Sequence, residues 1–202
     1  FDHTIFNWYS AKKSMETMFT KQLGISPADF TRAKDLQESK SDHYEIDEHL
    51  KMLSEISNVS LPRIRSAYSA WTKSLSSHAY KDALSLLRTV AKKSGTRILL
   101  TYGDRSNQNH FIRATGVGTY FKSVLFSPTK VGKVAALSKI LKRPTRIVFI
   151  NDDPAETMLA IEKLPLLSQV FLVERKDAKY TVIPASPDYT VVSTLTEIKK
   201  FL

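Results

Sequence analysis

The chain has 202 residues and contains no cysteine, which excludes disulfide bonds, thiolate metal sites and a cysteine nucleophile. No apolar run approaches the roughly 18 to 20 residues of a membrane-spanning helix, and no signal-peptide pattern stands at the start. Thirty Lys and Arg against twenty Asp and Glu give a net charge of +10, which favours an anionic partner: a phosphorylated metabolite, nucleic acid or a membrane surface.

This positive charge is unevenly distributed along the chain. Residues 10 to 80 carry ten basic and nine acidic side chains, so the remainder holds almost all of the excess. Because no compact Lys/Arg run is interleaved with aromatic residues, a solvated basic surface is favoured over a dedicated nucleic-acid site. The composition and the missing cysteines lead us to expect a cytoplasmic protein without a membrane partner.

The first six residues contain the pattern Asp-x-Thr, at Asp2 and Thr4. In the fuller pattern Asp-x-Asp-x-Thr, at the end of a strand, two carboxylates lie on one side of an extended segment. There the first can attack phosphorus and the second can move a proton. Asp2 fits the second carboxylate, so we expect the first to stand immediately before Phe1 in the natural protein.

Residues 10 to 80 are predicted to form a small helical bundle. A first amphipathic segment ends at Gly24, and Ser26-Pro27-Ala28-Asp29 supplies an N-cap, a proline at the first helical position and an acid for a second helix. Apolar spacing predicts a third helix containing Ile46, Leu50, Leu53 and Ile56, and a fourth containing Ile64, Tyr68, Trp71 and Leu75.

After Tyr80 the predicted helices and strands alternate. The expected strands cover 97–101, 123–126, 146–150 and 170–173, and the expected helices cover 81–93, 108–115, 131–141, 155–164 and 195–202. Strands that are apolar throughout and alternate with helices indicate an α/β fold, a Rossmann-like parallel sheet with helices on both faces. Ligands of such sheets bind beyond the carboxyl ends of the strands.

Two of these strand ends carry polar residues suited to phosphate. The first predicted strand ends in Thr101, followed by Tyr102 and Gly103, and a hydroxyl there can donate to a phosphate oxygen alongside loop amides. In isolation a threonine at this place is better explained as a turn residue. Beyond the strand 123–126, Lys130 and Lys133 open a helix, where a lysine can neutralise a carboxylate and a phosphate oxygen. The alternative is a surface lysine.

The strand 146–150 ends in Asn151, Asp152 and Asp153, and Glu156 follows in the next helix. Adjacent acids at the end of a buried strand are costly unless they are solvated or paired with a cation, and oxygen ligands suit Mg²⁺. The alternative is that Asp152 or Asp153 caps the following helix, which begins with a proline.

Taken in order, these motifs resemble the haloacid dehalogenase superfamily of phosphatases over essentially the whole chain. Asp2-x-Thr4 resembles the family's first motif, the run ending in Thr101 its second, the lysine after Phe126 its third, and Ile147 to Asp153 its fourth. The helical insertion is similar to the C1-type cap of some members. The resemblance implies a core domain of residues 1–9 and 81–202 and a cap domain of residues 10–80.

The resemblance also implies an activity, that of a magnesium-dependent phosphohydrolase acting through an aspartyl-phosphate on a small phosphorylated metabolite or nucleotide. The expected Asp before Phe1 would be the nucleophile, and Asp2 the general acid and base. Thr101 and Lys133 would hold the phosphoryl oxygens. Lys133 is preferred over Lys130 because Leu137 follows it four residues on and it sits better in the helix.

The remaining site residues follow from the same resemblance. Substrate binding is assigned to Thr4, Tyr102, Gly103 and Lys130. Mg²⁺ would be bound by the nucleophile, the backbone carbonyl of Asp2 and the carboxylate of Asp152, with Asp153 or Glu156 acting through water. Asn151 replaces the glycine that usually precedes the fourth-motif acid.

Other functions stay open at this point. A dehalogenase or a phosphonatase would have the same architecture, although a phosphonatase would need a Schiff-base lysine from the cap, and none is identified. A catalytically silent module could instead bind an anionic partner, nucleic acid or a phosphorylated ligand, through its basic core surface. The residue before Phe1 discriminates, because only an Asp there supports the enzyme.

Overall fold

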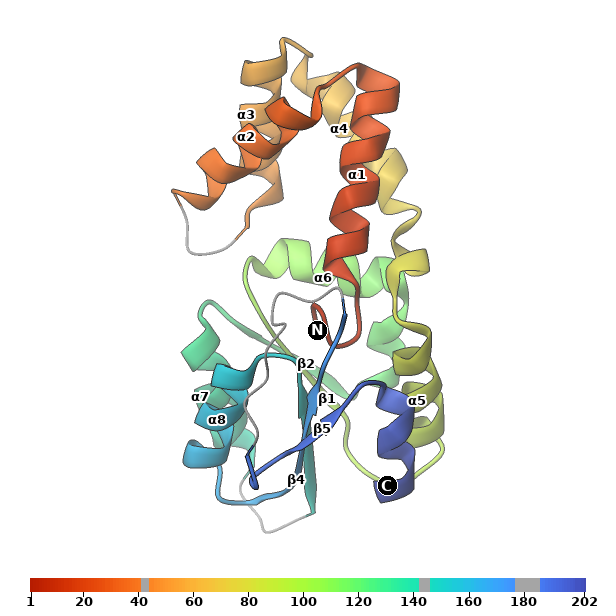
Figure 1. The fold of residues 1–202 in the computed structure, drawn as a ribbon, viewed down its shortest axis with the longest axis vertical. Coiled ribbons are helices and arrows are strands. Elements are labelled where there is room, and N and C mark those ends of the chain that lie inside the picture. Colours follow the sequence, from red (N-terminus) through yellow and green to blue (C-terminus); the bar gives the residue numbers. More distant parts are fainter. Residues whose placement is uncertain (41–43, 142–145, 177–185) are drawn as a thin grey trace. The chain divides into compact units, whose positions relative to one another are not determined.

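The computed structural model of the protein describes residues 1–40, 44–141, 146–176 and 186–202 (Figure 1). Two compact units form. The α/β unit consists of residues 1–9, 79–102 and 117–202, and the helical unit of residues 10–78 and 103–116. The helical unit thus takes in a segment that follows the first strand, in addition to the predicted insertion. The domain bounds 10–80 stay a prediction.

The helical unit is built from helices whose ends follow local signals. Ser26 caps α2 by accepting a hydrogen bond from the Asp29 amide at 3.0 Å, and Pro27 occupies its first turn. Trp71 is buried, and its indole donates to the Ser14 hydroxyl at 2.8 Å. The elements are α1 (Trp8–Leu23), α2 (Pro27–Glu38), α3 (Ile46–Ser57), α4 (Leu61–Thr72), the 3-10 helix η1 (Leu75–His78) and α6 (Arg105–Thr115).

His49 is a fully buried polar side chain in the helical unit. Its Nε2 lies 3.3 Å from the Phe30 carbonyl oxygen, and its Nδ1 is hydrogen-bonded to the Tyr44 hydroxyl. Since a carbonyl can only accept, the neutral ring carries its proton on Nε2 and accepts from Tyr44 at Nδ1. Burial lowers the pKa of His49 to about 4, with the bond to Phe30 opposing and the charges of Lys12 and Lys34 adding to the shift.

We expect His49 to make stability depend on pH. The unfolded chain binds its proton near the usual histidine pKa of about 6.5, whereas the folded chain does so only near 4. Its contribution is therefore complete above pH 6.5 and is lost as the pH falls toward 4, by about 3 kcal/mol in the free energy of unfolding. Urea unfolding at several pH values would measure this loss.

His49→Gln is the matched control, because glutamine can donate to Phe30 and accept from Tyr44 without titrating. The variant is expected to show a flatter dependence between pH 6.5 and 4 than the wild type. Equal slopes for the two proteins would contradict His49 as the source.

The α/β unit confirms the predicted α/β fold, since the pairings between its named strands are parallel and helices alternate with strands. In Figure 1, α7 and α8 lie on one side of the strands and α5 on the other. The strands are β1 (Ile98–Tyr102), β2 (Ser123–Ser127), β3 (Ile147–Asn151), β4 (Leu167–Val173) and β5 (Thr190–Val192). The helices are α5 (Lys81–Ala91), α7 (Lys130–Ile140), α8 (Pro154–Lys163) and the 3-10 helices η2 (Val117–Tyr120) and η3 (Leu195–Phe201).

Among the described residues, hydrogen bonding divides the strands into two sheets rather than the single sheet we predicted. β1 pairs with β2, while β3, β4 and β5 form the other sheet in that order. Leu100 of β1 and Phe149 of β3 nevertheless pack against the same apolar cluster of α7 and α8. The two sheets therefore share one core, whose buried members include Val134, Leu137, Ala160 and Leu164.

The structure differs from the predicted elements in several details, among them the start of β4 at Leu167 instead of residue 170. The strand β5 was not predicted, because three residues are too short a run to show periodicity. Helix α6 begins at Arg105 rather than near Gln108, since the Asp104 side chain caps it by accepting from the Asn107 amide at 2.7 Å. The segment 195–201 is a 3-10 helix with a Thr194–Glu197 capping box.

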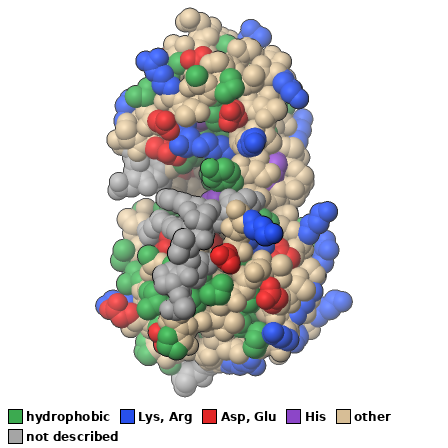
Figure 2. All heavy atoms as spheres, in the orientation of Figure 1, with side chains coloured by type: hydrophobic (Ala, Val, Ile, Leu, Met, Phe, Trp, Pro, Cys, Tyr) green, Lys and Arg blue, Asp and Glu red, His purple; other side chains and the backbone are tan. Residues whose placement is uncertain are grey.

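The surface bears on two further expectations. On the face in Figure 2, Lys and Arg side chains are scattered among acidic ones and do not gather into one patch. Within the described ranges, no helix is long and apolar enough to cross a membrane.

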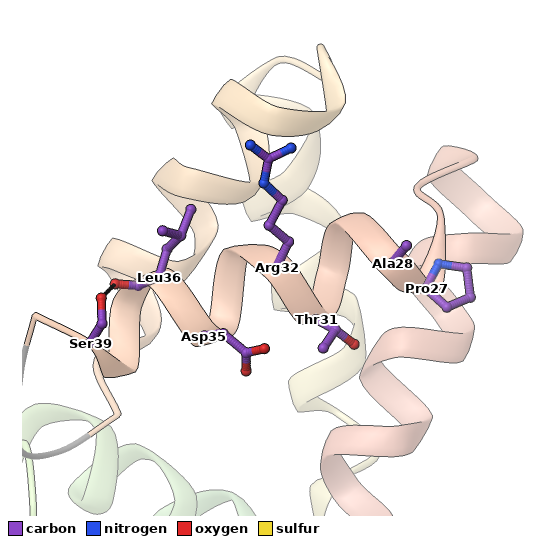
Figure 3. A pocket seen from close by; sticks show the side chains of 7 residues that line it. All are labelled: Pro27, Ala28, Thr31, Arg32, Asp35, Leu36 and Ser39. Atoms are coloured by element: carbon purple, nitrogen blue, oxygen red, sulfur yellow. Dashed lines mark hydrogen bonds between the residues drawn. The ribbon is translucent and has the colours of Figure 1, made fainter.

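A shallow pocket lies along α2, lined by residues that include Thr31, Arg32 and Asp35 (Figure 3), and it contains none of the predicted site residues.

Candidate active site

The loop formed by residues 1–6 is tightly folded by its own backbone. The Thr4 amide donates to the Asp2 carbonyl and the His3 amide to the Phe6 carbonyl, both at 2.7 Å, and the Ile5 amide to the Phe1 carbonyl at 2.9 Å. His3 adopts a left-handed conformation with φ of 58°, which is uncommon for a residue with a side chain. This loop, which we call the first-motif loop, holds Asp2 and Thr4 at its turn.

Thr4 connects the first-motif loop to the end of β3. Its hydroxyl donates to Oδ1 of Asp152 at 2.5 Å, although the two residues are 148 positions apart in the sequence. Both side chains are buried. The structure therefore brings together the first and fourth predicted motifs.

Asp152 is buried, and its surroundings act on the pKa of its carboxyl in opposite directions. Burial raises the pKa of its carboxyl, while the hydrogen bond from Thr4 and the nearby positive charges of His3 and Lys133 oppose the increase. A carboxylate in such a place gains from any further positive charge, because that charge offsets the cost of desolvation.

The Lys133 side chain contacts the last residue of β1 and the first turn of α8. Its ammonium group pairs with the Glu156 carboxylate and lies 5.2 Å from the centre of the Tyr102 ring. Lys133 and Glu156 are both buried, so solvent screens the attraction between their charges only a little. Of the two candidate lysines, Lys133 is thus at the strand ends. Lys130 is the first residue of α7, and its side chain lies outside the described part of the structure.

Local packing at the start of α7 explains how Lys133 is positioned beside Glu156 and Tyr102. Thr129 caps the helix by accepting a hydrogen bond from the Gly132 amide at 3.1 Å. A Cβ at Gly132 would lie 2.3 Å from the Ser127 hydroxyl oxygen, so only glycine lets the first turn of α7 approach the end of β2 this closely. Lys133 follows directly on that contact.

Asn151 and Glu156 form a small polar network beside Lys133. The Asn151 side-chain amide lies 3.4 Å from a Glu156 carboxylate oxygen, 3.3 Å from the Thr157 hydroxyl and 3.2 Å from the Asp153 carbonyl. The sequence predicted Glu156 only as a water-mediated metal ligand and did not predict its pairing with Lys133. The position of Glu156, five residues after the end of β3, could have suggested this pairing, because a residue in the first turn of a helix can face back to the strand end.

Asp153 serves as the N-cap of α8. Its Oδ1 accepts hydrogen bonds from the amides of Ala155 at 2.9 Å and Glu156 at 3.2 Å. The capping alternative therefore describes Asp153, while Asp152 faces Thr4. Capping competes with the predicted role of Asp153 as a metal ligand.

Thr101 and its neighbours stand at the end of β1 as predicted. Thr101 is buried, and in the parallel ladder it lies opposite Phe126, with Tyr102 opposite Ser127. Gly103 has a φ of 110°, a conformation that favours glycine, so the chain turns sharply after the strand. The structure thus gathers the side chains of Thr4, Asp152, Lys133 and Tyr102. Asp2 stands two residues before Thr4 in the chain, and Thr101 directly precedes Tyr102.

The donor atoms at the strand ends suit a magnesium ion. Across the described ranges, no group of three His, Cys, Asp or Glu side chains could hold a metal ion. Asp152 supplies one buried carboxylate, and the Thr4 hydroxyl of the first-motif loop lies beside it. Mg²⁺ prefers such oxygen donors and commonly takes only one or two carboxylates together with waters and substrate phosphates. The residues present therefore fit this ion.

The chain is similar to known proteins in structure rather than in sequence. Its sequence matches no protein-family model and no curated protein sequence. A haloacid dehalogenase-like protein from Burkholderia xenovorans LB400 superposes with a TM-score of 0.75 at 14% identity, over 99% of this chain and 94% of that one. The chain has the haloacid dehalogenase fold.

Other solved structures share the haloacid dehalogenase fold with this chain. YfnB of Bacillus subtilis, described as a HAD-hydrolase and bound to magnesium, has a TM-score of 0.64 at 16% identity, over 100% of this chain and 95% of that one. The L-2-haloacid dehalogenase of Xanthobacter autotrophicus, with chloropropionic acid covalently bound, has a TM-score of 0.62 at 16% identity, over 99% and 94%. The predicted superfamily resemblance is confirmed at the level of the fold.

Proposed function

We propose that the protein is a magnesium-dependent phosphohydrolase that acts through an aspartyl-phosphate. The nucleophile in this proposal is an Asp immediately before Phe1 in the full coding sequence. The observation that carries it is the hydrogen bond between Thr4 and Asp152, because it joins the first-motif loop to the acid after β3. The buried Lys133–Glu156 pair beside them supplies the cation that a phosphoryl group requires.

Each residue has a role that its position supports. The nucleophilic carboxylate attacks phosphorus and forms a new O–P bond while the bond to the leaving oxygen breaks. Asp2 gives its proton to that oxygen, and afterwards takes a proton from the water that attacks the aspartyl-phosphate. The Thr101 hydroxyl and the Lys133 ammonium hold the phosphoryl oxygens. Attack by water returns the nucleophilic carboxylate and releases phosphate.

The metal would be held by the nucleophile, the Asp2 backbone carbonyl and the Asp152 carboxylate. When bound, Mg²⁺ offsets the negative charge between the attacking carboxylate and the phosphoryl group. Asp153, which caps α8, contributes at most indirectly.

Leaving-group chemistry favours phosphate ester hydrolysis over dehalogenation. An alkoxide needs a proton as it departs, whereas a halide leaves without one. In this proposal Asp2 supplies that proton, from the loop that Thr4 joins to Asp152. The substrate in this proposal is a small phosphorylated metabolite or nucleotide, with the helical unit acting as a cap, and the net charge of +10 favours such an anion.

The test is phosphate release from an aryl phosphate by the full natural chain, followed by a panel of sugar phosphates, nucleotides and phosphoglycolate. We expect activity that EDTA abolishes and Mg²⁺ restores. Asp152→Asn keeps the shape of the side chain but removes its charge, and should lower kcat by about 100-fold or more and weaken Mg²⁺ binding measured by calorimetry. Wild-type protein that releases no phosphate, or Asp152→Asn with unchanged activity, would refute the proposal and favour a silent binding module.

A further inference from the structure

Arg175 is a buried arginine that none of the four motifs contains. It follows the end of β4 by two residues, and only 7% of it is exposed. Its Nη2 donates to the backbone carbonyl of Thr4 at 3.0 Å, and its Nη1 donates to Oδ2 of Asp82 at 2.8 Å. The guanidinium carbon lies 3.9 Å from the centre of the Tyr80 ring. Arg175 therefore contacts the first-motif loop from a segment 171 residues further along the chain.

Asp82 fixes Arg175 in turn. One carboxylate oxygen also accepts from the Leu195 amide at 2.7 Å, and the other accepts from the Ala83 amide at 2.9 Å. Burial works against its ionised form, but the hydrogen bonds from Arg175 and Leu195 outweigh burial and lower the pKa of Asp82. The pair is therefore charged at neutral pH, and its carboxylate is held by the start of α5 and the start of η3.

The planar guanidinium suits this task because its two terminal nitrogens point in fixed directions. One nitrogen binds an anchored carboxylate while the other binds the loop, and the flat face rests on Tyr80. An ammonium group is a compact charge on a flexible stem, so lysine cannot hold both partners in one geometry. A fixed anchor is of use here because the loop contains His3 in a sparsely populated conformation.

We propose that Arg175 is a positioning residue for the first-motif loop. By holding the Thr4 carbonyl, it keeps the Thr4 hydroxyl on Asp152 and keeps Asp2 in one orientation. The clamp consists of Arg175, Asp82 and the Thr4 carbonyl. Its role in turnover rests on the proposed phosphohydrolase function, whereas its effect on the loop does not.

Hydrogen exchange tests the clamp without any assumption about activity. Arg175→Lys should raise the exchange rate of the loop amides in a peptide covering residues 1–8 by about tenfold or more, since their protection depends on local opening. Arg97→Lys is the matched control. Arg97 also donates to backbone carbonyls of the α/β unit, to Tyr120 at 2.7 Å and Val90 at 3.2 Å, and should leave residues 1–8 unchanged. Unchanged loop exchange in Arg175→Lys would overturn the clamp.

Kinetics on the full natural chain test the positioning role. Arg175→Lys should lower kcat for an aryl phosphate by about 10- to 100-fold with little change in KM, because a small displacement of reacting groups costs this much. Arg97→Lys should keep the wild-type kcat. A double-mutant cycle with Thr4→Val should be non-additive, with the double variant hardly slower than the slower single variant.

The outcomes separate the two proposals. An inactive wild type would refute the phosphohydrolase function, while the exchange experiment would still decide whether the clamp exists. A loosened loop with wild-type kcat would overturn the positioning role. So would multiplicative effects of Arg175→Lys and Thr4→Val, because they would show that Arg175 does not act through Thr4.

Discussion

Asp2→Asn is expected to lower kcat for an alkyl phosphate by about 10²- to 10⁴-fold, the usual contribution of a positioned general acid and base. Asparagine has nearly the shape of aspartate but cannot carry the proton. The backbone bonds of the first-motif loop should survive, because the Asp2 carbonyl, not its side chain, accepts from Thr4. The melting temperature should therefore stay close to that of the wild type.

The leaving group sharpens the test of Asp2. A nitrophenolate departs without needing a proton, so phosphorylation of the enzyme should be only slightly slowed in Asp2→Asn. Hydrolysis of the aspartyl-phosphate still requires a base, so it should become rate-limiting. We expect a burst of nitrophenol followed by a slow steady state, and phosphoenzyme that accumulates in rapid-quench samples.

Asp188→Asn is a suitable control, since it neutralises an exposed acid of the same unit. It should leave both phases as in the wild type. If Asp2→Asn slows nitrophenyl and alkyl phosphates equally and shows no burst, Asp2 does not transfer the proton.

Lys133→Met should have two separate effects. The first is a drop in kcat of about 10²- to 10³-fold, because a preorganised charge is lost from the phosphoryl oxygens. The second is a loss of about 3 to 5 kcal/mol in the free energy of unfolding, because Glu156 is left as a buried charge without its cation. Steady-state kinetics and urea unfolding measure the two effects independently.

The double variant Lys133→Met with Glu156→Gln separates stability from chemistry. It should recover most of the lost stability, since no unpaired charge is then buried, but none of the lost kcat. Recovery of turnover in the double variant would show that Lys133 acts only by neutralising Glu156. Lys130→Met should be near wild type in both measurements if Lys133 is the functional lysine. A large loss of kcat in Lys130→Met alone would reverse that assignment.

Helix ends and apolar strands of this protein were predictable because their causes are local. Ser26 and Pro27 start α2 through contacts within four residues, and the apolar runs at 98–102 and 147–151 need no distant partner to be recognised as strands. The strand ends can be located for the same reason, and so the sequence alone indicates Thr101, Lys133 and Asp152 as candidates.

Side-chain partners could not be predicted in this way. Asp152 and Asp153 are adjacent and chemically alike, yet one receives the Thr4 hydroxyl and the other caps α8. The direction of the backbone at the end of β3 decides which of the two carboxylates faces Thr4. The local sequence does not indicate this direction. The pairing of Lys133 with Glu156 depends likewise on how α7 and α8 pack on each other.

The sequence by itself determined the α/β fold through short-range periodicity and capping, and its resemblance to the haloacid dehalogenase superfamily indicated most of the candidate residues. Only the tertiary structure decided which of these residues meet, and it added Arg175, which belongs to no motif. Its contacts with Asp82 and Thr4 span 93 and 171 residues. Contacts between residues so far apart in the sequence depend on how whole helices and strands pack together. That packing decides which partner lies within reach of each side chain.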